Sequence, residues 1–249
     1  MSSAPDLTGT LLRRERAIVA GGIALLIGLS WWFLASGAGM GGAASETTGM
    51  PTMHQPPLVA LVLMWWLMMV AMMLPSASPA VLLYSRVRAQ RGDAGAIVHP
   101  AVFAAGYAAV WLGFSVVAAI VQQLIATSTM TLADPELGDG VLIAAGVYQL
   151  SPFKGSCLRA CRSPARFLST HWRPGALGAA RLGIIHGAWC VGCCWMLMAL
   201  LFVGGVMNLA WIVALAVIVG SEKLLPAGRW IGRIAGIGLI AWGAVRLLL

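Results

Sequence analysis

The sequence contains few charged residues: Asp, Glu, Lys and Arg make up 10% of its 249 residues, whereas 60% are hydrophobic. A soluble domain of this size needs more polar surface, because its exterior faces water. Uncharged apolar runs of about 20 residues recur along the chain and are typical of helices that cross a membrane. The runs are continuous rather than alternating, which excludes a transmembrane β-barrel. The composition therefore predicts an all-α fold, a polytopic transmembrane helical bundle.

Acidic residues are the scarcer of the charged ones, eight against sixteen Lys and Arg, which gives a net charge of +8. No basic stripe is interleaved with stacking aromatic residues, so we expect no nucleic-acid binding. Seven spans are predicted, at 16–35, 57–83, 98–126, 138–153, 177–203, 206–221 and 229–248. With a cytoplasmic N-terminus, every basic residue except Arg246 falls on the cytoplasmic side. This distribution follows the positive-inside rule and explains the basicity by topology.

Cysteines are few and odd in number, and none of the five lies in a predicted external loop. A disulfide framework is therefore not expected. No small-residue cleavage site follows the first apolar run, so we interpret that run as a permanent anchor. The predicted organisation is a cytoplasmic tail (1–15), an anchor helix with an external loop (16–56) and a transmembrane domain (57–249). The loop is interpreted as a linker, although it contains four residues that could capture a soft metal: Met40, Met50, Met53 and His54.

The fifth predicted span contains a group of metal-binding residue types: His186, Cys190, Cys193 and Cys194. Because helical residues advance by about 100° each, these four donors share an arc of roughly 100°. Sulfur and imidazole are ligands of soft or borderline metals, and a sulfur-rich site favours Cu(I), with zinc as the less favoured alternative. The four donors extend over about 12 Å of helix, so one ion cannot contact them all. A second helix is therefore predicted to complete the site.

The second predicted span is rich in methionine, with Met64, Met68, Met69, Met72 and Met73. Three of these, spaced four residues apart, lie on one face of a helix within an arc of about 80°. Counted from the ends of their spans, Met72 and Cys190 fall at a similar depth, near the middle of the membrane. We therefore predict that Met72 or Met68 completes the Cu(I) site.

A second cysteine pair, Cys157 and Cys161, lies in a predicted cytoplasmic segment, and its spacing puts both thiols on one face if the segment is helical. The neighbouring Arg159 and Arg162 would favour thiolates. The pair could hand an ion on at the cytoplasmic face. The alternative is that the arginines only mark topology and the thiols are incidental.

Two further features lie near predicted cytoplasmic ends of spans. Pro75 and Pro79 predict that the second span is bent or broken, because proline removes a backbone donor. The adjacent Glu222 and Lys223 form a locally paired interfacial charge in the simplest interpretation. In the alternative, Glu222 contacts a metal ligand without binding the metal itself, or it transfers a proton.

Several motifs together resemble a bacterial family described as predicted metal-binding integral membrane proteins. They are WLMMVAMMLP (66–75), KGSCLRACRSP (154–164) and HGAWCVGCCWMLM (186–198), with further similarity at 204–209 and 222–226. The resemblance covers about 57–240. It implies an inner (cytoplasmic) membrane protein that handles copper for a copper-dependent oxidase or another membrane-complex partner. The residues at the motif positions are Met68, Met69, Met72, Met73, Cys157, Cys161, His186, Cys190, Cys193 and Cys194.

Two other function classes stay open at this point. Cys190 and Cys193 are spaced C-x-x-C, which suits a membrane thiol-disulfide oxidoreductase that uses quinone. A non-catalytic structural or haem-anchoring subunit is the other, although bis-histidine haem needs two facing histidines and only His186 is placed within a span. No P-loop is visible, so ATP-driven transport is not expected. The leading prediction is a Cu(I)-binding protein in the lipid bilayer, with no catalytic residue assigned.

Overall fold

The computed structural model describes residues 7–37, 56–91, 98–125, 132 and 134–248, and these residues form an all-helical fold. The loop residues Met40, Met50, Met53 and His54 lie outside the described residues. The helices are α1 (Leu7–Ala35), α2 (Leu58–Gln90), α3 (Val98–Ile125), α4 (Pro135–Leu150), α5 (Pro152–Arg162), α6 (Pro164–His171), α7 (Gly175–Ala199), α8 (Leu201–Gly204), α9 (Leu209–Leu224) and α10 (Gly228–Leu248).

Among the described residues, five helical segments are long and apolar enough to cross a membrane: Arg16–Ala35, Leu58–Gln90, Val98–Ile125, Gly175–Gly204 and Gly228–Leu248. The other two predicted spans overlap α4 and α9, which have 16 residues each. At 1.5 Å per residue each of these extends over about 24 Å, less than the hydrocarbon core of about 30 Å. The all-α class is thus confirmed, with five candidate spans by length. The seven-span topology and the orientation of the N-terminus stay predictions.

The helix α2 is continuous through Pro75 and Pro79, so of the two predicted alternatives, bent or broken, the broken helix is wrong. A proline leaves the carbonyl four residues earlier without its helical donor. Trp31 Nε1 of α1 donates to the carbonyl of Ala71 at 3.2 Å, and Ser78 Oγ donates to that of Pro75 at 2.8 Å. Both freed carbonyls therefore have a replacement donor, and the helix can run on.

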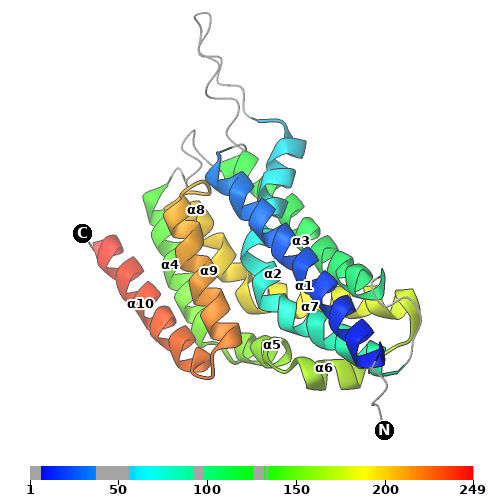
Figure 1. Cartoon of the computed structure of the whole chain (residues 1–249). Coiled ribbons are helices and arrows are strands. Elements are labelled where there is room, and N and C mark those ends of the chain that lie inside the picture. The colour runs from blue at the N-terminus through cyan, green and yellow to red at the C-terminus, as the bar shows by residue number, and fades with distance from the viewer. Residues whose placement is uncertain (1–6, 38–55, 92–97, 126–131, 133, 249) are drawn as a thin grey trace, which may run out of the picture.

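The helices form a bundle in which α7 packs closely along α3, α1 packs on α2, and α10 packs on α4 (Figure 1). Glycine permits the approach of α7 to α3, because a Cβ at Gly183 would lie 2.0 Å from the carbonyl oxygen of Phe103. The short helices α5 and α6 lie at the end of the bundle where α1 begins, and α8 lies at the opposite end (Figure 1). The five methionines of α2 face the interior, each 3% exposed or less.

Candidate metal centre

The two predicted cysteine groups lie in one place. Cys161 of α5 has its Sγ 4.0 Å from the Sγ of Cys193 in α7. Cys157 packs against Gly192, which directly precedes Cys193 in α7. A Cβ at Gly192 would lie 3.0 Å from the sulfur of Cys157. Because Gly192 has no side chain, α5 can press its thiols against α7. The structure thus joins the α5 pair to the α7 stripe, whereas the sequence suggested a separate exit.

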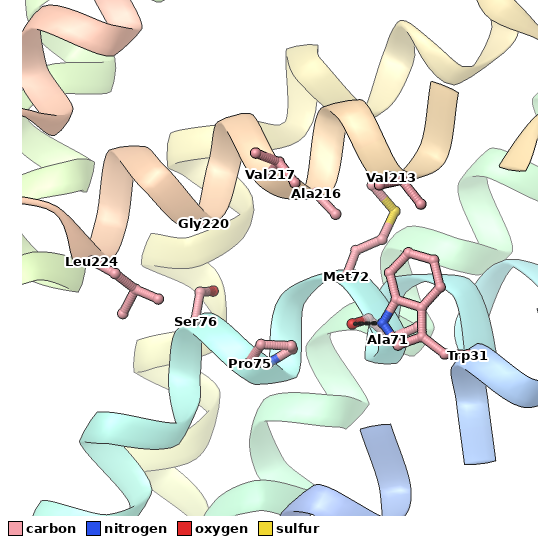
Figure 2. A pocket seen from close by; sticks show the side chains of 10 residues that line it. All are labelled: Trp31, Ala71, Met72, Pro75, Ser76, Val213, Ala216, Val217, Gly220 and Leu224. Carbon is pink, nitrogen blue, oxygen red and sulfur yellow. Dashed lines mark hydrogen bonds between the residues drawn. The ribbon is translucent and has the colours of Figure 1, made fainter. Parts of the chain in front are cut away.

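A methionine of α2 completes a second sulfur pair. Cys194 Sγ lies 3.8 Å from the thioether sulfur of Met73. Met72, the neighbouring residue, instead lines a pocket of about 410 Å³ bordered by α1, α2 and α9, and its side chain points toward Val213 (Figure 2). The structure therefore brings Met73, and not Met72, to the cysteines of α7. Met64, Met68 and Met69 are buried in the core.

Cys190 lies at the centre of the site and contacts residues from two other helices. Its Sγ is 3.0 Å from the hydroxyl of Tyr107 in α3, and Lys223 Nζ of α9 donates to it at 2.9 Å. Sequence reasoning missed both residues as parts of the site. For Lys223 a signal existed, since an ionisable side chain next to an apolar span often has a function. For Tyr107 the apolar helix around it offered none.

His186 is buried one turn before Cys190, and it lies among aromatic rings. Its ring centroid is 5.2 Å from that of Phe167, 5.9 Å from that of Tyr107 and 6.0 Å from that of Phe103. Its Nδ1 has no hydrogen-bond partner among the described residues. A buried nitrogen without a partner costs free energy, so this atom is available as a ligand.

Buried polar contacts hold α5 in place against α4 and α9. Lys154 Nζ of α5 lies 2.5 Å from Glu222 Oε2, and Gln149 accepts from Lys154 and donates to the other oxygen of Glu222. Arg162, at the end of α5, donates to the carbonyls of Leu225 at 2.7 Å and Pro226 at 2.9 Å. Glu222 thus pairs across helices with Lys154, rather than with its neighbour in sequence.

The structure raises the pKa of both thiols of α5, whereas the sequence suggested that nearby arginines lower it. Burial raises the pKa of Cys157, and the nearby Cys193 adds to the increase. Hydrogen bonds with the sulfurs of Cys190 and Cys193, together with burial, hold the pKa of Cys161 well above its ordinary value. Both directions oppose the thiolates that the neighbouring arginines suggested. Arg159 instead donates to Ser156, and Arg162 donates to the carbonyls of Glu222 and Leu225.

The donor set suits a soft ion of low coordination number. Within the described residues no three His, Cys, Asp or Glu side chains converge as a ready metal-binding group. The sulfurs instead form pairs, 4.0 Å apart for Cys161 and Cys193 and 3.8 Å for Cys194 and Met73. With a metal–sulfur bond of about 2.3 Å, two ligands roughly 4 Å apart subtend an angle of about 120° at the metal. Thiolate and thioether donors in such pairs favour Cu(I).

Residues 62–246 match the family model PpoB2, which is described as copper chaperone. The match covers well over half of the 249 residues, so the chain belongs to this copper chaperone family. No curated protein and no solved structure matches the chain. The family membership agrees with the resemblance recognised in the sequence motifs and indicates a copper-related role.

Proposed function

We propose that this protein binds Cu(I) within the membrane and delivers it to a copper-dependent partner. The observation that carries the proposal is the convergence of the buried Met73 of α2, the buried thiols of α7 and the half-buried Cys161 of α5. Sulfur ligands without a carboxylate among them favour Cu(I) over Zn(II) or harder ions. In this proposal Cys190, Cys194 and Met73 form one set of ligands.

A second set lies directly beside the first. Cys193 lies between Cys190 and Cys194 on α7 and is paired with Cys161 of α5. Cys157 of α5 packs on the neighbouring Gly192. An ion could pass from Cys194 to Cys193 by exchange of one sulfur ligand at a time, without leaving the protein. His186 lies one turn away from Cys190 and offers a nitrogen ligand for an intermediate position. Delivery would then proceed toward α5.

For the topology, we propose seven spans with a cytoplasmic N-terminus in the inner membrane. The basic residues of α5 and α6 lie at the same end of the bundle as the start of α1 (Figure 1). Cationic side chains are enriched on the cytoplasmic side of membrane proteins. The helices α4 and α9 can cross a locally thinned bilayer, since a short span is accommodated at modest cost.

The test is the copper content of the purified protein after reconstitution with Cu(I) under reducing conditions. The parent protein is expected to retain copper, and a variant with Cys190→Ala, Cys193→Ala and Cys194→Ala is expected to lose it. Met72→Leu serves as the matched control, because it removes a buried sulfur of α2 that lines the pocket instead. Equal copper in the parent and the triple variant, or none in either, would contradict the proposal.

A thiol-redox function is the second candidate, and the proximity of Cys161 and Cys193 favours it. A disulfide requires the sulfurs to close to about 2.05 Å. Its formation would release two electrons and two protons to an acceptor such as a quinone. The thiol of Cys193 also donates to the carbonyl of Cys190 at 3.1 Å. Mass spectrometry after oxidation would reveal a 161–193 disulfide if this function holds.

A further inference from the structure

The ammonium group of Lys223 lies close to two sulfur atoms and one hydroxyl oxygen of the site. Its Nζ lies 2.9 Å from Cys190 Sγ, 3.4 Å from Ser76 Oγ and 3.9 Å from Met73 Sδ. The side chain is buried, with 7% of the residue exposed. An ammonium has three donors and no acceptor, so it can only use the electron pairs that a metal ion would also use.

The nearest carboxylate in sequence does not neutralise this lysine. Glu222 is occupied by Lys154, with their charged atoms 2.5 Å apart. A buried ammonium costs free energy unless it is paired or hydrogen-bonded. The partners that lower this cost for Lys223 are the sulfur of Cys190, the hydroxyl of Ser76 and the thioether of Met73. The lysine is therefore held by the candidate copper ligands themselves.

Building on the Cu(I) function proposed above, we propose that Lys223 is a built-in competitor cation. Its ammonium fills the position between Cys190 and Met73 in the empty protein, and Cu(I) must displace it to bind there. Two positive charges a few ångströms apart in a buried site repel each other strongly. The lysine thus lowers the affinity of the site for Cu(I). It returns to Cys190 and Met73 when the ion leaves, which suits a protein that must release the metal it binds.

The pocket beside α2 gives the side from which an ion would meet this lysine. Ser76 lines the pocket, together with Met72 and Gly220 (Figure 2). Its Oγ also lies 3.4 Å from Lys223 Nζ. Cys190 is not among the lining residues. The ammonium therefore lies behind the pocket wall, in contact with Cys190, and an ion that enters past Met72 would reach Lys223 before the thiol.

The experiment measures the Cu(I) affinity of the purified full-length protein by competition with a chromogenic Cu(I) chelator in the absence of oxygen. Lys223→Leu removes the cation, keeps an apolar side chain and adds no metal ligand, and it is expected to bind Cu(I) about tenfold more tightly or better. Lys223→Arg keeps a cation and is expected to bind no more tightly than the parent. Arg229→Leu removes an exposed cation of α10 and controls for net charge.

An increase in affinity is diagnostic, because a variant that merely disturbs the fold would lose affinity. If the parent binds Cu(I) and Lys223→Leu binds it equally or more weakly, the competitor role is overturned while the copper function stands. If Lys223→Arg and Lys223→Leu both gain affinity, the displaced charge is not the cause and the proposal also fails. If neither the parent nor any variant binds Cu(I), the copper function itself fails.

Discussion

Cys161 and Cys193 lie with their sulfurs 4.0 Å apart, although 31 residues and two helix boundaries separate them in the chain. This contact unites the thiols of α5 with those of α7. If both sulfurs bind the same ion, Cys161→Ser and Cys193→Ser should each lower Cu(I) retention at the α5 side. The double variant should lose little more than either single variant, because the two residues share one partner. Additive losses in a double-mutant cycle of copper affinities would indicate two independent positions.

The adjacent methionines Met73 and Met72 provide a second test. Met73→Leu should weaken Cu(I) binding by about tenfold or more, since even supporting residues around a metal typically contribute this much. Met72→Leu should leave the equilibrium affinity unchanged, because that side chain lines the pocket. Both residues are at most 2% exposed, so the two substitutions disturb packing to a similar degree. Equal affinities of the two variants, measured by chelator competition, would remove Met73 from the site.

The contact of Trp31 with the Ala71 carbonyl predicts a compensation by Pro75. Trp31→Phe should destabilise the protein by about 1–3 kcal/mol, the usual cost of an unsatisfied buried acceptor. In a Pro75→Ala background the backbone N–H of residue 75 can bond this carbonyl, so the same substitution should cost less. Thermal unfolding of the four proteins in detergent measures the difference. The same cost in both backgrounds would show that Trp31 acts through packing alone.

The raised pKa values of Cys157 and Cys161 predict a loss of stability at alkaline pH. Below the ordinary thiol pKa of about 8.5, both thiols are neutral in the folded and the unfolded chain. Their ionisation therefore does not reduce the stability of the fold in that range. As the pH rises further, the unfolded chain ionises first, and stability is lost up to the raised pKa of the folded protein. A Cys157→Ser, Cys161→Ser variant should show a shallower decrease in its unfolding temperature between pH 8 and 10 (about the range set by the thiol pKa). Parallel curves would contradict the shifts.

Much of the helical framework could be predicted, because uncharged apolar runs leave few alternatives to spanning helices. The stripe from His186 to Cys194 could also be predicted from helical spacing. The choice of Met73 over Met72 could not, since it depends on the rotation of α2 against its neighbours. Local sequence likewise suggested that Glu222 pairs with Lys223, whereas contacts from α5 and α7 give each a different partner. Such pairings are long-range and leave no periodic pattern.

The central claim is that the buried sulfurs of α2, α5 and α7 bind Cu(I), and X-ray absorption at the copper edge tests it most directly. The protein loaded with one equivalent of Cu(I) is expected to show two or three sulfur neighbours at about 2.3 Å. Substitution of Cys190, Cys193 and Cys194 by alanine should abolish this sulfur shell. A copper ion surrounded by oxygen or nitrogen alone, or a spectrum unchanged by the triple substitution, would contradict the account.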